Sequence, residues 1–494
     1  MIERLEVSPT VAAAYAVSIA GSRQDAVAML ASIDRASTAG LLLEAVVAAC
    51  DGKRLRSEAT LRRAIETAAD RDREYLVDLL VPLLVARGLV TRASALLDAF
   101  PFDQHHAIGR LALRAVVDAG AGAMASSTAA SAAVRVAFGY GPHDEVTRLR
   151  IHEHLALAAA YRSEAAAALD QVERGLRIVR ARRAPRAASA LRAIAYAVHT
   201  RLTGNADAAW HEANAAQQAA QAAGDAVAYE LACVAVYELA AERGDDAEIR
   251  SSHAAFERVT ASDEHRARFG VGIADVIRLA LDGDRESARD AAAVLAKSAA
   301  RSDGERALCE ALSALVAIAL GDELTARRSC CRVRTALRAP SSNVPAGELR
   351  YRRIAGALAA LAGPWAAGED AAARLTGTWM RRDPEASALH ALGAGAALDD
   401  VPTTVRGYGR LVCIARPKPD ARETRDPLTA TEREILGLLA AGRNAAEAAR
   451  MTGRNVHTVR THIRNAAAKL DAHGRADLVA RARRLGITGE RADL

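Results

Sequence analysis

A short run near the C-terminus combines side chains that can form paired hydrogen bonds with flat partners. Arg460, Thr461, Arg464 and Asn465 lie in the run TVRTHIRN, residues 458–465, which contains no acidic residue. A guanidinium can donate two hydrogen bonds to O6 and N7 of guanine, and a carboxamide can pair in the same bidentate way with adenine. These residue types therefore predict recognition of base edges in double-stranded DNA.

Apolar residues in the same stretch place the polar side chains on one side of a helix. The apolar positions recur at helical spacing and share one face: Val459, Ile463, Ala466 and Leu470. At about 100° per residue, the side chains predicted to point away from that face are His457, Arg460, Thr461, Arg464 and Asn465. Thr458 and Lys469 lie at the flanks, where DNA phosphates would run.

Two shorter helices are predicted just before this one. Residues with helix-capping spacing are Thr429 with Glu432, Asn444 with Glu447, and Asn455. Such side chains accept hydrogen bonds from the free N–H groups of a first helical turn. Gly442 and Gly453 are expected to end the two helices in left-handed turns. The order helix, helix, tight turn, helix predicts a helix-turn-helix.

The stretch resembles the LuxR-type helix-turn-helix shared by quorum regulators, two-component response regulators and MalT-like activators. LTATERE at 428–434 follows the family's LTxRExE opening, with Thr431 where arginine is usual, and TVRTHIRN matches the recognition helix nearly residue for residue. Lys469 and Leu470 also match the LuxR-type pattern. Residues matching a fourth helix, which the family often uses to dimerise, are Arg475, Leu478, Val479, Ala482 and Leu485.

This resemblance implies a four-helix DNA-binding domain over residues 426–494. By similarity, Arg460, Thr461 and Arg464 would face base edges, and Thr458 and Lys469 would contact the DNA backbone. Residues that replace the family's usual aliphatics are Ala448, Thr452, Arg454 and Ala466. Each large aliphatic lost from a core removes roughly 1–3 kcal/mol of stabilisation, so a thinner domain core is expected.

Residues 1–400 are rich in strong helix formers, and no segment shows sustained alternation of apolar and polar residues. A weak repeat with spacings of 38 to 40 residues occurs at Gly204-Asn205, Gly244-Asp245, Gly283-Asp284 and Gly321-Asp322, with looser forms near Gly21 and Gly88. Repeats of this length are typical of stacked helical hairpins. The region loosely resembles degenerate tetratricopeptide repeats and the sensor regions of MalT-like regulators. The alternative is an irregular helical bundle.

The predicted fold class is therefore all-α, with an N-terminal α-helical solenoid and a C-terminal LuxR-type domain. Between them, residues 401–425 are interrupted by prolines and rich in arginine, which predicts a basic linker. Residues 401–494 hold 18 basic and 10 acidic residues, whereas the first 400 hold 48 and 50. Positive charge concentrated at one end is typical of a protein that binds a polyanion.

Several classes of function are disfavoured by the sequence. No lysine lies in a GK[ST] phosphate loop, and the six cysteines show no metal-ligand spacing. His152 and His154 diverge around a helix by about 200°, so they do not form a natural ligand pair. We therefore expect no cofactor, no metal and no enzymatic activity. The scattered cysteines and the absence of a basic leader or a long apolar run predict a cytoplasmic protein without a membrane segment.

Together these features predict a bacterial transcriptional regulator, and the resemblance favours an activator. The implied partners are promoter DNA, a second copy of the chain and RNA polymerase, with a protein or small-molecule effector bound by the helical region. One alternative is a helical scaffold that binds proteins and never contacts DNA. Another is a sigma-factor-like promoter-recognition protein, which the 3% aromatic content argues against.

Overall fold

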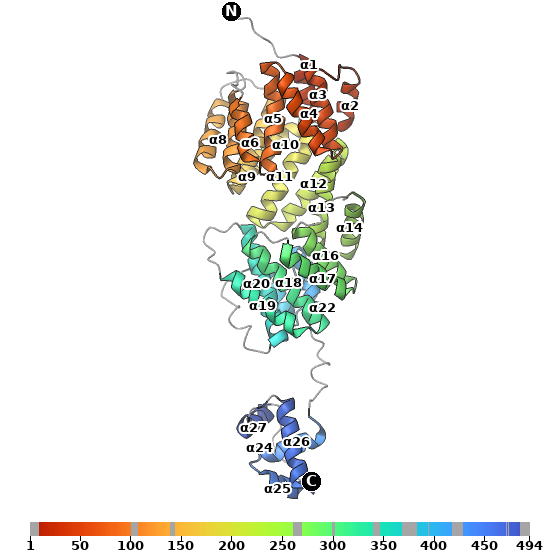
Figure 1. The fold of residues 1–494 in the computed structure, drawn as a ribbon, viewed down its shortest axis with the longest axis vertical. Coiled ribbons are helices and arrows are strands. Elements are labelled where there is room, and N and C mark those ends of the chain that lie inside the picture. The colour runs from red at the N-terminus through yellow and green to blue at the C-terminus, as the bar shows by residue number, and fades with distance from the viewer. Residues whose placement is uncertain are drawn as a thin grey trace, which may run out of the picture. The chain divides into compact units, whose positions relative to one another are not determined.

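The computed structural model forms two compact units, Met1–Arg416 and Pro417–Leu494, here called the N-terminal and C-terminal units. It describes residues 9–99, 107–138, 144–259, 269–298, 302–338, 346–367, 383–393, 395–416, 428–470, 472 and 474–484. Within these ranges every regular element is a helix and no strand occurs (Figure 1). The prediction of an all-α protein is confirmed.

The N-terminal unit consists of many short helices packed as neighbours. The first are α1 (Pro9–Ala20), α2 (Arg23–Leu30), α3 (Thr38–Cys50), α4 (Arg54–Thr67), α5 (Asp70–Ala86), α6 (Val90–Ala99), α7 (Ala107–Gly120), α8 (Met124–Phe138), α9 (Glu145–Tyr161), α10 (Ala165–Arg182) and α11 (Pro185–Val198). The π-helix η2 (His199–Thr203) follows α11 directly.

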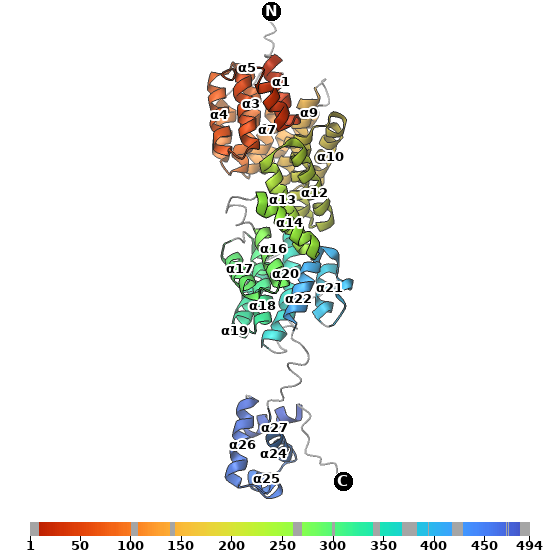
Figure 2. The ribbon, with the colours of Figure 1, turned by 90° about the vertical axis from the view of Figure 1, so that its right-hand side faces the viewer.

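The remaining helices of this unit are α12 (Ala206–Ala223), α13 (Ala226–Arg243), α14 (Asp246–Val259), α16 (Phe269–Leu281), α17 (Arg285–Ser298), α18 (Asp303–Leu320), α19 (Glu323–Leu337), α20 (Ala346–Ala367), α21 (Pro384–Gly393) and α22 (Arg406–Ala415), with 3₁₀ turns η5 (Leu398–Asp400) and η6 (Thr403–Val405). Consecutive helices pack in pairs, as α11 does with α12 and α12 with α13. Helix α18 packs against both α19 and α20 (Figure 2).

The predicted Gly-Asp and Gly-Asn pairs lie at the turns between helices. The glycines at 204, 244, 283 and 321 all have left-handed backbones, with φ between 65° and 84°. The following Asn or Asp accepts a hydrogen bond from the first turn of the next helix, as Asp322 does from Thr325 N–H at 3.0 Å. A fifth pair, Gly224-Asp225, makes the same turn midway between the first two and was not included in the predicted repeat. These turns explain the helical pairing; the tetratricopeptide likeness stays a prediction.

Small and medium aliphatic side chains fill the interior. One large cluster extends from α1 to α11 and a second from α13 to α22, and both consist mainly of Ala, Leu, Val and Ile. Tyr237 and Phe256 are exceptions, with fully buried rings stacked at 5.5 Å between centroids. Alanine-rich faces allow close helix approach, so many short helices can share one core.

Residues 401–416 belong to the hydrophobic cluster that extends from α13 to α22. The prediction of a linker beginning at Val401 was therefore wrong for these residues. The buried side chains of this segment are Val401, Val405, Tyr408, Leu411, Val412 and Ala415. From Val405 onward they recur at helical spacing, while the arginines that suggested a linker lie between them. Pro402 precedes η6, where a missing N–H has no consequence. Residues 417–425 of the predicted linker lie outside the described residues.

Candidate nucleic-acid interface

The C-terminal unit contains α24 (Ala430–Ala440), α25 (Ala445–Thr452), α26 (Val456–Lys469) and α27 (Arg475–Arg484) (Figure 1). Both predicted capping boxes form. Thr429 Oγ1 accepts from Glu432 N–H at 3.2 Å, and Glu432 Oε2 accepts from Thr429 N–H at 2.7 Å. Asn444 and Glu447 repeat this exchange at 3.0 and 2.9 Å. Each box satisfies N–H groups that the first helical turn leaves unpaired.

The predicted turns between these helices are also present. Gly442 and Gly453 have φ of 86° and 66°. After Gly453, the Arg454 N–H donates back to Ala449 O at 2.9 Å, which closes a Schellman-type turn. Asn455 Oδ1 then accepts from His457 N–H at 2.8 Å at the start of α26. The local sequence thus sets the angle at which α26 leaves α25.

Helix α26 has one buried and one exposed side, as its periodicity predicts. Val459 and Ala466 are fully buried in the core of the C-terminal unit. On the other side, the exposed residues are His457, Thr458, Arg460, Arg464 and Asn465. Thr461 is half-buried, and its hydroxyl donates to His457 O at 3.1 Å. The structure therefore brings these predicted site residues to one surface of one helix.

This exposed surface of α26 carries uncompensated positive charge. Neither Arg460 nor Arg464 has an ion-pair partner within the described part of the chain, and no acidic residue lies in α26. A guanidinium without an internal partner keeps its donors available for an acceptor outside the protein. The surface can therefore bind an anionic or acceptor-rich partner without first breaking an ion pair.

Lys469 has a partner that the sequence did not indicate. Its ammonium contacts Glu432 Oε2 at 2.7 Å, with the Glu432 side chain 3% and the Lys469 side chain 38% exposed. Burial acts to raise the pKa of Glu432, but hydrogen bonds from Lys469 and Thr429 outweigh it and hold that pKa below its ordinary value. Lys469 thus ties the end of α26 to the start of α24. Its predicted contact with DNA phosphate stays a prediction.

Two departures from the LuxR pattern meet in space. Arg454 Nη2 donates to Thr431 Oγ1 at 3.3 Å, and its Nη1 lies 3.5 Å from Glu434. Thr431 stands where the family has arginine, and Arg454 stands where it has an aliphatic residue. In the sequence the two departures are 23 residues apart, whereas in the structure their side chains are in contact.

The other substituted positions are filled by small residues. Ala448 and Ala466 are completely buried in the domain core. Thr452 satisfies its hydroxyl within its own helix by donating to Ala448 O at 2.7 Å. Small side chains therefore occupy these core positions, and the lower stability expected from them stays a prediction.

Helix α27 is held against the other three. Arg475 Nη2 donates to Arg443 O at 2.9 Å, and Arg481 Nη1 donates to Leu470 O at 2.7 Å. Leu478 and Ala482 are buried in the domain core, and Val479 is half-buried. Leu485 lies outside the described residues. These contacts give α27 a structural role within one chain, and its predicted part in dimerisation stays a prediction.

Both histidines considered as ligands are buried. His152 Nδ1 lies 2.9 Å from Gln171 Oε1, and His154 is buried beside Asp78. Burial lowers the pKa of His154 to about 4. No grouping of His, Cys, Asp and Glu suited to a metal ion occurs in the described ranges. Over the same ranges, none of the helices has the length and apolar character needed to cross a bilayer.

Residues 426–482 match the family described as bacterial regulatory proteins, luxR family. The C-terminal region is therefore a LuxR-family helix-turn-helix domain, and a large all-helical region precedes it. No match was found among curated proteins. The match ends before Leu485 and covers all of the residues predicted to contact DNA.

Proposed function

We propose that this protein is a sequence-specific DNA-binding transcriptional regulator. The observation that carries the proposal is the exposed side of α26, where Arg460, Arg464 and Asn465 lie and where neither arginine has an ion pair within the described residues. An α-helix fits the major groove of B-DNA, and these side chains match the acceptors and donors of guanine and adenine. The LuxR-family match of the same residues supports it.

In this mechanism α26 enters the major groove with its buried side held by α24 and α25. Arg460 and Arg464 donate in pairs to guanine edges, and Asn465 and Thr461 supply further hydrogen bonds. His457 and Thr458, near the helix start, contact the phosphate backbone. Lys469 contributes through its positive charge near the backbone while it stays paired with Glu432.

The wider role follows from the arrangement of the chain. A small domain with a few base-contacting residues gains affinity and specificity when two copies bind paired half-sites, so we propose a homodimer on promoter DNA. The N-terminal unit would respond to a protein or small-molecule effector and alter promoter occupancy in the cytoplasm. Recruitment of RNA polymerase, hence activation, is the proposed outcome.

Genome-wide chromatin immunoprecipitation tests the proposal. The wild type should give discrete peaks that share a two-fold motif, and an Arg460→Ala, Arg464→Ala double variant at equal level should lose them. A matched control is Arg177→Ala, Arg180→Ala, which removes the same charge from two exposed positions of α10. That control should keep the peaks.

Binding of the purified full chain to the DNA motif shared by the peaks should weaken in the Arg460→Ala, Arg464→Ala variant and stay unchanged in the control variant. Each bidentate contact contributes about 1–3 kcal/mol of discrimination, so the double variant should lose at least about tenfold in affinity. If the wild type shows no enrichment in several growth conditions and no affinity for duplex DNA, the proposal fails, and the alternative of a protein-binding scaffold gains support.

A further inference from the structure

The N-terminal unit contains a partly open cavity of about 730 Å³. Its walls come from helices far apart in the chain, including α3, α5, α11, α13 and α20, together with η2. Most of the wall is aliphatic, with alanines such as Ala190, Ala193 and Ala228 between leucine and isoleucine side chains. Cavities of about 300–1,000 Å³ with apolar walls and a few polar groups are typical of small-molecule sites.

One polar part of the wall lies where α9 and α11 line the cavity. Arg150 pairs with Asp78 at 2.7 Å and with Glu153 at 2.9 Å. Arg186 donates to Ser18 O at 3.0 Å and lies 3.6 Å from Asp225. These arginines are therefore neutralised by carboxylates of the protein itself.

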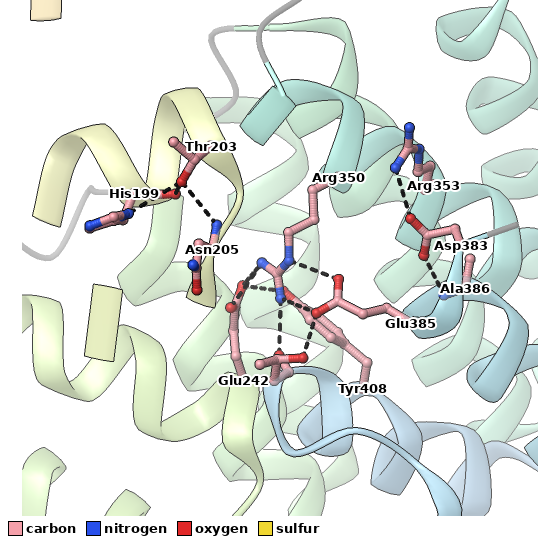
Figure 3. A network of polar contacts seen from close by, with 11 residues as sticks. His199, Thr203, Asn205, Glu242, Arg350, Arg353, Asp383, Glu385, Ala386 and Tyr408 are labelled. Carbon is pink, nitrogen blue, oxygen red and sulfur yellow. Dashed lines mark hydrogen bonds and ion pairs between the residues drawn. The ribbon is translucent and has the colours of Figure 1, made fainter. Parts of the chain in front are cut away.

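A second polar part is a cluster around Arg350, here called the Arg350 cluster: Glu242, Arg350, Glu385 and Tyr408 (Figure 3), together with Thr404, which contacts Arg350 and Glu385. Arg350 contacts Glu242 Oε2 at 3.1 Å, Glu385 Oε2 at 2.9 Å and Thr404 O at 3.0 Å. The Tyr408 hydroxyl donates to Glu242 Oε1 at 2.8 Å. Glu242 and Arg350 also line the cavity, so this cluster is shared between the cavity wall and α22.

These contacts restrict the chemistry of a ligand. A charged group next to Arg150, Arg186 or Arg350 would have to break one of these ion pairs or remain unpaired among aliphatic side chains, and both are unfavourable. An uncharged molecule with an apolar body would displace only water from the walls. A hydroxyl or carbonyl on such a molecule could exchange hydrogen bonds with the Arg350 cluster.

We propose that this cavity binds an uncharged, mostly apolar small molecule and that the Arg350 cluster couples its occupancy to α22. Glu242, near the end of α13, both lines the cavity and accepts the hydrogen bond of Tyr408. A shift of Glu242 or Arg350 on binding therefore changes the contacts that hold α22 in place.

The packing of α22 leaves little freedom to absorb such a shift. A Cβ at Gly407 would clash with the carbonyl oxygen of Ala241, so backbone meets backbone there. Arg410 Nη2 adds an ion pair with Asp246 at 3.0 Å. Among the described helices of the N-terminal unit, α22 is the last along the chain, and the unit ends at Arg416. The regulatory consequence rests on the proposed function, whereas ligand binding itself does not.

Ligand binding is tested on the full chain with N-phenyl-1-naphthylamine, an uncharged fluorescent probe. The wild type should bind it saturably, and more tightly than its sulfonated analogue anilinonaphthalenesulfonate. Ala193→Trp, which places an indole in the cavity, should weaken binding at least about tenfold. Ala129→Trp, at an exposed position of α8 outside the cavity, is the matched control and should bind as the wild type does. Absence of saturable binding, equal binding by Ala193→Trp, or tighter binding of the sulfonate would overturn the site.

Coupling is tested by hydrogen exchange of the α22 amides. The probe should slow this exchange in the wild type. Tyr408→Phe keeps the buried ring but loses a hydrogen bond to a carboxylate, so α22 should exchange about tenfold faster and respond less to the probe. Tyr161→Phe, on α9, should behave as the wild type. If the probe binds but leaves wild-type α22 unchanged, the coupling is refuted.

Binding of duplex DNA, measured on the same preparations by fluorescence anisotropy, separates this proposal from the proposed function. A wild type that binds the probe but no DNA overturns the regulator and leaves the cavity site standing. A wild type that binds DNA but no probe overturns the cavity site and leaves the regulator standing.

Discussion

The ion pair between Glu432 and Lys469 allows a quantitative test of how the C-terminal unit is held together. Glu432→Gln removes the negative charge but keeps a side chain that can still complete the capping box with Thr429. The variant therefore loses the charged contact with Lys469 and weakens the charge-assisted hydrogen bond from Thr429 N–H. Because the carboxylate is 3% and the lysine 38% exposed, the contact is neither fully buried nor a free surface pair.

The expected loss follows from that intermediate exposure. A hydrogen bond to a charged group contributes about 1.5–3 kcal/mol when shielded, and an exposed ion pair contributes less than about 1 kcal/mol. We therefore expect Glu432→Gln to lower the free energy of opening of α24 and α26 by about 1–2 kcal/mol, a factor of roughly 5–30 in exchange rate. Hydrogen exchange with mass spectrometry on the full chain measures this for each helix.

The matched control is Glu434→Gln, on the same helix. Its side chain is 48% exposed and lies 3.5 Å from Arg454, so its loss should cost less than about 0.5 kcal/mol. Equal exchange in the two variants would show that Glu432 has no special role, and the argument from burial and capping would be refuted. Slower exchange in Glu432→Gln than in the wild type would show that desolvation of the Glu432 carboxylate costs more free energy than its contacts with Lys469 and Thr429 contribute.

Three further predictions concern the interface and its support. Thr431→Arg alone should destabilise the C-terminal unit by about 0.5–1 kcal/mol, because it places a second guanidinium beside Arg454. Adding Arg454→Leu should restore stability. Hydrogen-exchange rates of the wild type, the two single variants and the double variant measure the coupling between the two positions. Arg464→Ala should cost about 1–3 kcal/mol and relax sequence preference at one base pair, whereas Thr458→Ala should weaken binding to all sequences alike, as binding to a panel of duplexes would show. The pKa of His154 is about 4 in the folded chain and ordinary when unfolded, so the folded state binds fewer protons between these values. The N-terminal unit should therefore lose about 3 kcal/mol as pH falls from about 6.5 to 4, and His154→Gln should flatten this slope in urea unfolding.

Much of the C-terminal unit could be predicted because its signals are local. A capping box joins residues three apart, as Thr429 and Glu432 are, and a glycine such as Gly453 ends a helix by its own backbone freedom. The two faces of α26 follow from a period of 3.6 residues. For the same reason, the Gly-Asp turns of the N-terminal unit could be located before any packing was known.

Contacts between residues distant in the chain could not be predicted in this way. The segment 401–416 has prolines and arginines like a linker, yet its apolar side chains find a core made by other helices. Lys469 has the type and position of a phosphate contact, but a carboxylate 37 residues earlier in the chain lies within 2.7 Å. Composition reports only what a side chain can bind, and tertiary packing decides what lies within reach.

By itself, therefore, the sequence determined that the chain is helical, where many of its helices begin and end, and which side of α26 is exposed. Only the tertiary structure decided that Arg454 contacts Thr431, that the chain from Val401 to Arg416 belongs to the N-terminal unit, and that a cavity exists with Arg350 in its wall. The physical reason is the distance along the chain over which each kind of interaction acts. Capping, turn formation and periodicity act within one or two helical turns, whereas Tyr408 meets Glu242 across 166 residues through the packing of whole helices.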